Sequence, residues 1–402
     1  MSIQKLTMKD KKQIIKLYRY CFYREYFPED SPKWDQYFKM INFDKSFGYF
    51  KDNKLISVVL ALDFECFIRG KISSMTGIAG VATKPEYRRK GYSRKLLEKT
   101  LTEMYKNGTH LSALYPFKHS YYRKFGYVNC EKSMNITFSP RNILLPRNFT
   151  PMKISEISIE ESYEKLQKIH DEIAKKYNFV RFKTPFTWAW YNIPTSDVWK
   201  IIIAQNMQQE IVGYMVTEIS SLSEKYAVKL TINQMFAKNE QVRLSFLDYI
   251  KKHSDQIKEV EWILFGDEIV FDYFDELWET RKITSGGAMY RLIHVQKLLE
   301  NIDYPPTVKE SFTMKITDEY CPQNEKPMNV SIKNSQASVT LHEKKPEKYD
   351  IEIDIKAFTQ LVLGYRSLEE LIQMRRVAIT NKKRKLLEEI FSKRMTRLLV
   401  LF

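Results

Sequence analysis

A basic, glycine-containing stretch at residues 81–94 carries the residue types best suited to binding phosphate. An apolar, β-branched segment (residues 78–81) precedes it, and apolar residues recur after it at helical spacing, which predicts strand, loop and helix. Gly91 would let the backbone approach a ligand, and the helix N-terminus would direct N–H groups and a positive dipole end at it. The flanking cations are Arg88, Arg89, Lys90 and Arg94. The pattern predicts a pyrophosphate-binding loop; the alternative is a solvated basic turn before an ordinary helix.

The elements that position this loop form an α+β unit. Thr7 is a candidate N-cap with Asp10 three residues on, and an apolar stripe follows to residue 22. Strand signals cover residues 48–50, 54–67 and 72–82, the last two separated by a sharp turn around Gly70. After the loop we expect a helix at 92–106, a strand at 111–115, a short helix at 118–124 and a strand at 127–138. This order of helix, antiparallel strands, loop and helix predicts one compact domain.

The middle of the chain repeats this order more faintly. Prolines at 140, 146 and 151 mark a linker, and we expect a helix at 159–176 after it. Strands at 199–204, 210–219 and 228–236, a helix at 242–254 and a strand at 260–265 follow. The segment that corresponds to the basic loop, residues 237–243, has no glycine and no arginine pair. A second copy of the fold would therefore lack the phosphate site.

The last region begins near residue 289 and ends on an apolar tail. Strands are expected at 311–316, 328–333, 336–342 and 350–355, and helices at 356–363, 368–374 and 382–393. The final five residues, 398–402, are all apolar. Because chain ends in water are usually polar and loose, we expect this C-terminus to dock against the protein and to carry its α-carboxylate with it.

Composition limits the class of protein. The chain has 402 residues, enough for two or three domains, and 44% of them are hydrophobic, which excludes disorder as its class. The four cysteines form no CxxC pair and the six histidines no HExxH spacing, which argues against a metal site or a disulfide framework and for a reducing cytoplasm. No segment resembles a signal peptide or a membrane span, so we expect a soluble protein.

The net charge of +16 indicates an anionic partner. The densest basic run, residues 382–385, opens a helical pattern, so a solvated helix face explains it better than nucleic-acid binding. No helix-turn-helix, zinc-finger or RNA-recognition signature accompanies the run. A phosphate-bearing, nucleotide-like cofactor would use the basic loop at 88–94 equally well.

Three features together resemble the Eis-type (enhanced intracellular survival) N-acetyltransferases of the GNAT superfamily, over essentially the whole chain. They are the basic loop at 88–94, the stretch Tyr122-Arg123-Lys124-Phe125-Gly126-Tyr127, and a terminal Phe402. The resemblance implies an α+β fold with an active GNAT domain (1–145), a degenerate GNAT-like domain (146–288) and a sterol-carrier-protein-like domain (289–402). It also implies acetyl-CoA as donor, amines as acceptors and a hexameric assembly.

The resemblance implies site residues by matched position. Backbone groups of Val81, Ala82 and Thr83 would line the pantetheine. Phe117 and Lys118 would flank the cofactor, Tyr122 would be the general acid, and the carboxylate of Phe402 the general base. The pyrophosphate cradle would consist of Arg89, Lys90, Gly91, Tyr92, Ser93 and Arg94.

These roles suit acyl transfer. The reaction needs a neutral amine, a base for its proton, and a donor for the leaving thiolate, for which a tyrosine with a pKa of about 10 is suitable. A carboxylate with a pKa of about 3.5 is a better base when apolar neighbours desolvate it. Each role has an alternative: Tyr122 and Phe402 could be purely structural. His119 could be a second base or a surface imidazole, and Glu29 and Asp30 could meet a cationic acceptor or form a solvated turn.

The acceptor stays open at this point. A positively charged protein steers polycationic aminoglycosides away unless its pocket is locally acidic, so aminoglycoside acetylation is only one candidate activity. A peptide, a polyamine or a lysine side chain would serve the same chemistry. Two hypotheses from other classes also stay open. One is a nucleic-acid-binding or regulatory protein on an inactive GNAT scaffold, and the other is a lipid carrier that uses the C-terminal domain.

Overall fold

The computed structural model describes residues 1–22, 28–31, 33–181, 199–223, 227–265, 268–342 and 348–399. The chain folds into two compact units. The first contains residues 1–130 and 288–394, and the second contains residues 131–287 and a short C-terminal segment from Met395. The N-terminal and C-terminal domains therefore share one unit, and the middle domain forms the other.

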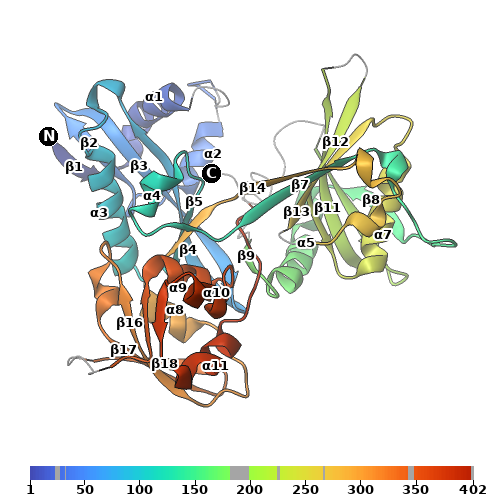
Figure 1. The fold of residues 1–402 in the computed structure, drawn as a ribbon. Helices are drawn as coiled ribbons and strands as arrows, with labels where there is room; N and C mark the ends of the chain where they lie inside the picture. Colours follow the sequence, from blue (N-terminus) through green and yellow to red (C-terminus); the bar gives the residue numbers. More distant parts are fainter. Residues whose placement is uncertain are drawn as a thin grey trace. The chain divides into compact units, whose positions relative to one another are not determined.

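The N-terminal domain is built on a mixed sheet with the order β1-β2-β3-β4-β5-β15-β6 (Figure 1). Strands β1 to β4 are antiparallel, and β5 is parallel to β4. The strands are β1 Ser2–Lys5, β2 Phe47–Lys51, β3 Lys54–Ile68, β4 Lys71–Thr83, β5 Leu111–Leu114, β15 Met289–Leu292 and β6 Val128–Asn129. The helices are α1 Lys11–Cys21, α2 Lys33–Met40, α3 Tyr92–Lys106 and α4 His119–Arg123.

Helices cover both faces of this sheet. Val59 of β3 packs in one core cluster with the apolar face of α3 and with α4. Its neighbour Leu60 lies beside Gly80 of β4, which in turn contacts the ring of Tyr18 on α1. Because neighbouring residues of a strand point to opposite faces, α3 and α4 cover one face and α1 covers the other. The loop that joins β4 to α3 therefore lies at one end of a sheet buried on both sides.

The C-terminal domain has its own five-stranded sheet, in the order β18-β17-β16-β19-β20. Its strands are β16 Ser311–Thr317, β17 Met328–Lys333, β18 Gln336–Leu341, β19 Ile351–Asp354 and β20 Val377–Ile379. Its helices are α8 Val295–Asn301, α9 Ile355–Val362, α10 Leu368–Gln373 and α11 Asn381–Ile390. Asp354 caps α9 through hydrogen bonds from two backbone N–H groups of its first turn.

Helix α9 joins the C-terminal domain to the N-terminal sheet. Thr359 accepts a hydrogen bond from the backbone of Leu292, and Gln360 donates one to the carbonyl of Asn129. The buried guanidinium of Arg69, in the β3–β4 turn, donates to four carbonyls at the C-terminal ends of α9 and α11. A cation interacts favourably with the negative end of a helix dipole, so Arg69 stabilises the contact between the N-terminal sheet and the C-terminal domain. Burial lowers the pKa of Arg69 to about 9, and the charge of Arg394 adds to this effect.

The middle unit contains a sheet with the order β14-β7-β13-β12-β11-β10-β8. Its strands are β7 Lys132–Phe138, β8 Lys153–Ile157, β10 Trp199–Gln205, β11 Ile211–Ser221, β12 Val228–Ala237, β13 Glu259–Phe265 and β14 Arg281–Gly286. Strand β9 (Asn178–Arg181) pairs with β21 (Thr396–Arg397), and the helices are α5 Ile159–Ala174 and α7 Glu240–Lys251. Strands β10 to β12 are antiparallel and β13 is parallel to β12, the same pattern as β2 to β5.

The predicted fold class is confirmed, and several details differ from the sequence expectations. Residues 33–40 form a helix that was not predicted, and neither were the strands β1, β9, β14 and β20. The single strand expected at 127–138 is two strands, β6 and β7, that belong to different sheets. Glu131, which separates them, is buried and pairs with Arg397 and the backbone of Leu398. No described helix is both long enough and apolar enough to cross a bilayer.

Candidate active site

Strands β4 and β5 pair over only three residues and then separate. Their partners are Met75 with Leu111, Thr76 with Ser112, and Gly77 with Ala113. Beyond Gly77, β4 continues to Thr83 with β3 on one side, while β5 pairs with β15 on its other side. Among the described residues, the end of β4 therefore has an open edge toward β5, where a ligand can complete the hydrogen bonds of the strand.

A β-bulge in β4 sets the direction of the backbone groups along this open edge. Leu60 pairs with Ala79 and Val58 with Ala82, so Gly80 and Val81 oppose a single residue of β3. Gly80 has a φ of +55°, and a Cβ there would lie 2.4 Å from the ring of Tyr18, so only glycine fits. Bulges of this kind bend a strand and change the direction of its backbone groups.

The bulge leaves the backbone groups of Val81 and Thr83 on the open edge. The N–H of Lys84 donates to Ile56 on β3, whereas the carbonyl of Thr83 accepts from the side chain of Arg88. The backbone N–H and C=O groups of a strand alternate in direction from one residue to the next. Those of Val81 therefore point the same way as those of Thr83, and those of Ala82 point toward β3. Two of the three predicted pantetheine contacts are thus available at the edge, and the third residue supports the strand.

The loop after β4 ends at an α3 N-terminus that no side chain caps in the described structure. Gly91 is the N-cap residue with a φ of +80°, and the first turn contains no acidic residue. A Cβ on Gly91 would meet no described atom within 4 Å. The first N–H groups of α3 therefore have no side-chain cap among the described residues and can accept an anion.

The cations of the loop have different positions. Arg88 donates its Nε to Thr83 and so supports the loop from inside. Lys90 bonds back to the carbonyl of Glu86 and lies over the Tyr87 ring. Arg89, with a φ of +61°, is exposed, and Arg94 extends from the first turn of α3 into a pocket. Of the predicted cradle cations, Arg89 and Arg94 are thus directed outward from the loop, and Lys90 is turned back.

The remaining cradle residues connect α3 to its surroundings. The hydroxyl of Ser93 shares a hydrogen bond of 2.9 Å with the hydroxyl of Tyr121 on α4. The ring of Tyr92 packs against Tyr49 of β2 at a centroid distance of 4.5 Å. Burial raises the pKa of Tyr121, while the Ser93 hydrogen bond and the charge of Arg94 act in the opposite direction. Ser93 and Tyr121 therefore fix the distance between the two helices at the phosphate end of the site.

Tyr122 lies inside the cluster that lines the separation of β4 and β5. Its side chain is 3% exposed and packs in one core cluster with Ile78 and Leu114, the residues at which the two strands diverge. Its hydroxyl makes no hydrogen bond within the part of the chain that the structure describes. Burial raises the pKa of Tyr122, so the phenol stays protonated, and in that form it can donate a proton.

The other predicted residues lie at the rim of the site or outside the described residues. Phe117 is 69% exposed, with its ring 5.5 Å from that of Tyr122. Lys118 is the exposed N-cap residue of α4. Phe402, predicted as the base, lies outside the residues that the structure describes.

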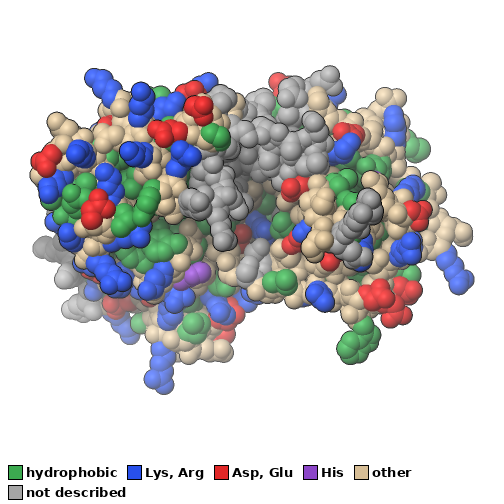
Figure 2. Space-filling model, turned by 90° about the horizontal axis from the view of Figure 1, so that it is seen from above, with side chains coloured by type: hydrophobic (Ala, Val, Ile, Leu, Met, Phe, Trp, Pro, Cys, Tyr) green, Lys and Arg blue, Asp and Glu red, His purple; other side chains and the backbone are tan. Residues whose placement is uncertain are grey.

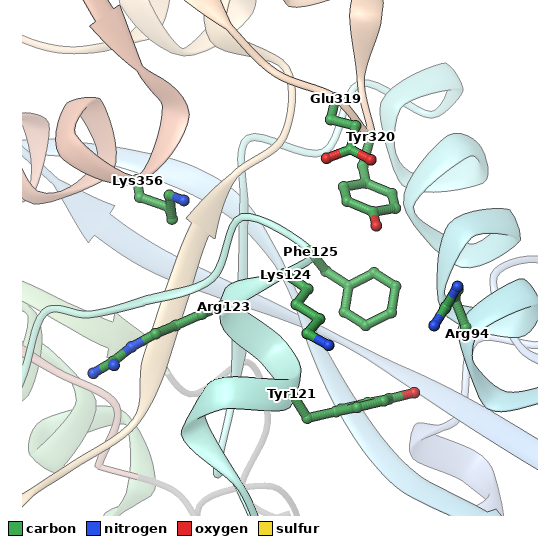
Figure 3. A pocket seen from close by; sticks show the side chains of 8 residues that line it. All are labelled: Arg94, Tyr121, Arg123, Lys124, Phe125, Glu319, Tyr320 and Lys356. Carbon is green, nitrogen blue, oxygen red and sulfur yellow. The ribbon is translucent and has the colours of Figure 1, made fainter. Parts of the chain in front are cut away.

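A pocket of about 410 Å³ lies beside Arg94, and sequence reasoning missed it. Figure 3 shows residues of α3, α4 and the C-terminal domain around it. Lys124 and Phe125 lie two and three residues after Tyr122, so their position near the site could have been predicted from the sequence. The positions of Glu319 and Tyr320 could not, because only the folded C-terminal domain brings them to α4.

The corresponding helix of the middle unit begins with a side-chain cap. Asn239 precedes α7, and its side chain accepts a hydrogen bond from the backbone N–H of Val242. This cap occupies the position that Gly91 leaves open at α3. The prediction that residues 237–243 lack a phosphate site agrees with this geometry.

Comparisons with known proteins agree with the fold and the site of the N-terminal and C-terminal domains. Residues 2–129 match the family model of an acetyltransferase (GNAT) domain, and residues 295–398 match that of a sterol carrier protein domain. A search of curated proteins gave no match. The chain is thus an acyltransferase of the GNAT class with a sterol carrier protein domain.

The whole chain shares its fold with solved structures. A probable N-acyltransferase from Enterococcus faecalis V583 is 23% identical with a TM-score of 0.87, covering 100% of this chain and 99% of that one. A GCN5-related N-acetyltransferase from Anabaena variabilis ATCC 29413 is 20% identical with a TM-score of 0.86, and Eis1 from Mycobacterium abscessus is 15% identical with a TM-score of 0.78; both cover 100% of each chain. At these identities the likeness shows that the chain shares its whole fold with these proteins.

Proposed function

We propose that the protein transfers an acetyl group from acetyl-CoA to a primary amine. The observation that carries this proposal is the open edge of β4 next to the uncapped N-terminus of α3. An extended pantetheine chain can pair with Val81 and Thr83, while the α3 N-terminus and Arg89 receive a pyrophosphate. The space beside Gly91, where a Cβ would meet no described atom within 4 Å, leaves room for the same ligand.

The residues of this chain supply three parts of the reaction. Backbone N–H groups at the open edge stabilise the oxygen on which charge develops as the amine attacks the thioester. The hydroxyl of Tyr122 donates a proton to the sulfur as the C–S bond breaks. The amine must lose a proton to a base, for which we propose the Phe402 carboxylate on the basis of the sequence resemblance.

The acceptor is the least determined part of the proposal. We propose an aminoglycoside, a polyamine, a peptide or a lysine side chain as its class. On the face shown in Figure 2, Lys and Arg side chains are scattered with Asp and Glu between them, so the net charge of +16 is not gathered into one basic stripe there. This distribution supports a small anionic donor as the partner over nucleic acid.

A panel of amines assayed for CoA thiol release tests the function. We expect release that depends on both acetyl-CoA and an amine, and an Arg89→Glu variant that binds acetyl-CoA much more weakly in calorimetry. Deletion of Phe402 should lower turnover without changing donor affinity. Salt-dependent DNA binding without acetyl-CoA binding would instead favour the regulatory alternative.

We also propose a homo-oligomer, a hexamer by resemblance. Between residues 269 and 283 of the middle unit, five large apolar side chains are exposed, with Trp278 at 97%. The others are Ile269, Phe271, Leu277 and Ile283. Exposed apolar side chains that lie together are typical of protein interfaces. Light scattering measures the molar mass of the wild type and of Trp278→Lys in solution. We expect a smaller assembly for the variant, and a monomeric wild type would contradict the proposed homo-oligomer.

A further inference from the structure

The pocket beside Arg94 lies between two helices of the N-terminal domain and the C-terminal domain. Figure 3 shows Arg94, Lys124 and Tyr320 pointing toward the same space from α3, the end of α4 and the turn after β16. Four cations line it, Arg94, Arg123, Lys124 and Lys356, against one carboxylate, Glu319. Its aromatic side chains are Tyr121, Phe125 and Tyr320. A ligand that carries both negative charge and an aromatic ring fits this lining.

We propose that this pocket binds the 3′-phosphorylated nucleoside end of CoA, so that the C-terminal domain forms one wall of the donor site. The inference rests on the proposed function and extends it, because it assigns a donor-binding role to residues far from the basic loop in sequence.

The first argument is continuity with the phosphate end of the site. Arg94 lies three residues after Gly91, about 4.5 Å along the helix axis. A pyrophosphate at the α3 N-terminus has the pantetheine on one side, along the edge of β4. Its other side carries the ribose, and the same ribose bears the 3′-phosphate. The nucleoside must therefore leave the loop within reach of Arg94.

The second argument is charge. Arg94 acts on the ionisation of both tyrosines in the pocket. Burial raises the pKa of Tyr320, Glu319 and Glu98 add to the increase, and Arg94 opposes it, as it does for Tyr121. Neither Arg94 nor Lys124 forms an ion pair with a carboxylate among the described residues, so both cations are available to a phosphate.

The third argument is the aromatic surface. The rings of Phe125 and Tyr320 pack at a centroid distance of 5.0 Å, one from each domain. The ring of Tyr121 lies 5.3 Å from that of Phe125 and is held by Ser93. Phe125 is 1% exposed and supports the other two rings from beneath, so Tyr121 and Tyr320, both partly exposed, are the rings on which adenine can stack. A base on an aromatic ring contributes about 1–3 kcal/mol.

The fourth argument is that the wall from the C-terminal domain is fixed in place. Asp318, at the start of the turn that carries Tyr320, forms a buried ion pair of 2.7 Å with Arg291 of β15. Gly126, with a φ of +81°, leaves room for this guanidinium directly after α4. Lys356 stands in the first turn of α9, whose other residues are buried. The pocket is thus built before any ligand arrives.

The test compares acetyl-CoA with acetyl-3′-dephospho-CoA in binding and in turnover, using the full-length protein. Wild type should bind acetyl-CoA at least about tenfold more tightly than the dephospho form, a difference of about 1.4 kcal/mol. Lys124→Gln should lose this preference while binding the dephospho form as before, whereas Arg94→Gln, which also removes a cation of the pyrophosphate cradle, should weaken the binding of both donors. Tyr320→Ala, in the C-terminal domain, should weaken both donors equally, and adenosine 3′,5′-bisphosphate should compete with CoA.

Lys106→Gln, the same charge change at the far end of α3, is the control and should keep the wild-type preference. Equal affinity of the wild type for the two donors, or a Tyr320→Ala variant with unchanged affinity, would overturn the pocket assignment while leaving the transferase intact. Absence of any acetyl-CoA binding would instead remove the proposed function itself, so the two failures are distinguishable.

Discussion

Arg291 and Asp318 form a fully buried ion pair that connects the N-terminal sheet to the C-terminal domain. Their side chains lie 2.7 Å apart and are 0% and 1% exposed. Asp318 also accepts hydrogen bonds from the backbone of Cys321 and from Asn324, so its second oxygen is satisfied as well. A buried charge pair with this geometry costs desolvation but specifies one arrangement of the two elements, because either charge alone would be unpaired.

Asp318→Asn should therefore destabilise the protein strongly. The substitution leaves the Arg291 guanidinium buried without a counter-charge, for which about 3–5 kcal/mol of unfolding free energy is expected to be lost. Urea denaturation measures this loss. Arg291→Met combined with Asp318→Leu removes both charges and should recover much of it; a double variant no better than the single one would contradict the ion-pair account.

Tyr122 and Tyr127 allow a matched test of the general acid. Both rings are buried in the same cluster, but Tyr127 shares a hydrogen bond of 2.7 Å with Ser112, while the Tyr122 hydroxyl has no such partner in the described residues. Tyr122→Phe should lower kcat by about 10²–10⁴-fold with unchanged stability. Tyr127→Phe should lose about 1 kcal/mol of stability with little change in kcat. Turnover near wild type in Tyr122→Phe would restrict Tyr122 to packing.

A comparison of Gly91→Ala with Gly108→Ala should distinguish the cost of backbone strain from a loss of acetyl-CoA binding. Gly91 and Gly108 both have positive φ angles, +80° and +68°, at the two ends of α3. Alanine at either position should cost about 1–2 kcal/mol of stability because of its backbone conformation. Only Gly91 lies at the N-terminal end of the helix, beside the proposed pyrophosphate, so only there would the new methyl group compete with the ligand for space. Calorimetry should show weaker acetyl-CoA binding for Gly91→Ala alone, and equal affinities in both variants would contradict the anion site.

The parts of the site that are local in sequence could be predicted from it. Gly91 at the start of α3 and the capping box of Thr7 with Asp10 depend on a few neighbouring residues. The bulge at Gly80 was missed, because the apolar approach to the loop has the same composition with or without it. Tyr320 was missed because its place beside Phe125 depends on long-range packing of the C-terminal domain, which periodicity does not encode. The catalytic role of Tyr122 stays a prediction.

His110 should make stability fall in mild acid. It precedes β5, and its Nδ1 is buried without a hydrogen-bond partner among the described residues. Burial, together with the charges of His294 and Lys297, lowers its pKa from 6.5 to about 4. The folded state thus holds a neutral imidazole at a pH where the unfolded chain already binds a proton, so stability decreases as the pH falls from 6.5 toward 4.

His110→Phe removes this proton linkage and keeps a buried ring. Thermal unfolding of the two proteins between pH 7 and pH 4 should show a wild-type melting temperature that falls more steeply below pH 6.5 and runs parallel to the variant near pH 7. His342→Gln, at an exposed position, should follow the wild-type curve. Parallel curves for wild type and His110→Phe over the whole range would show that His110 is protonated equally in the folded and unfolded states.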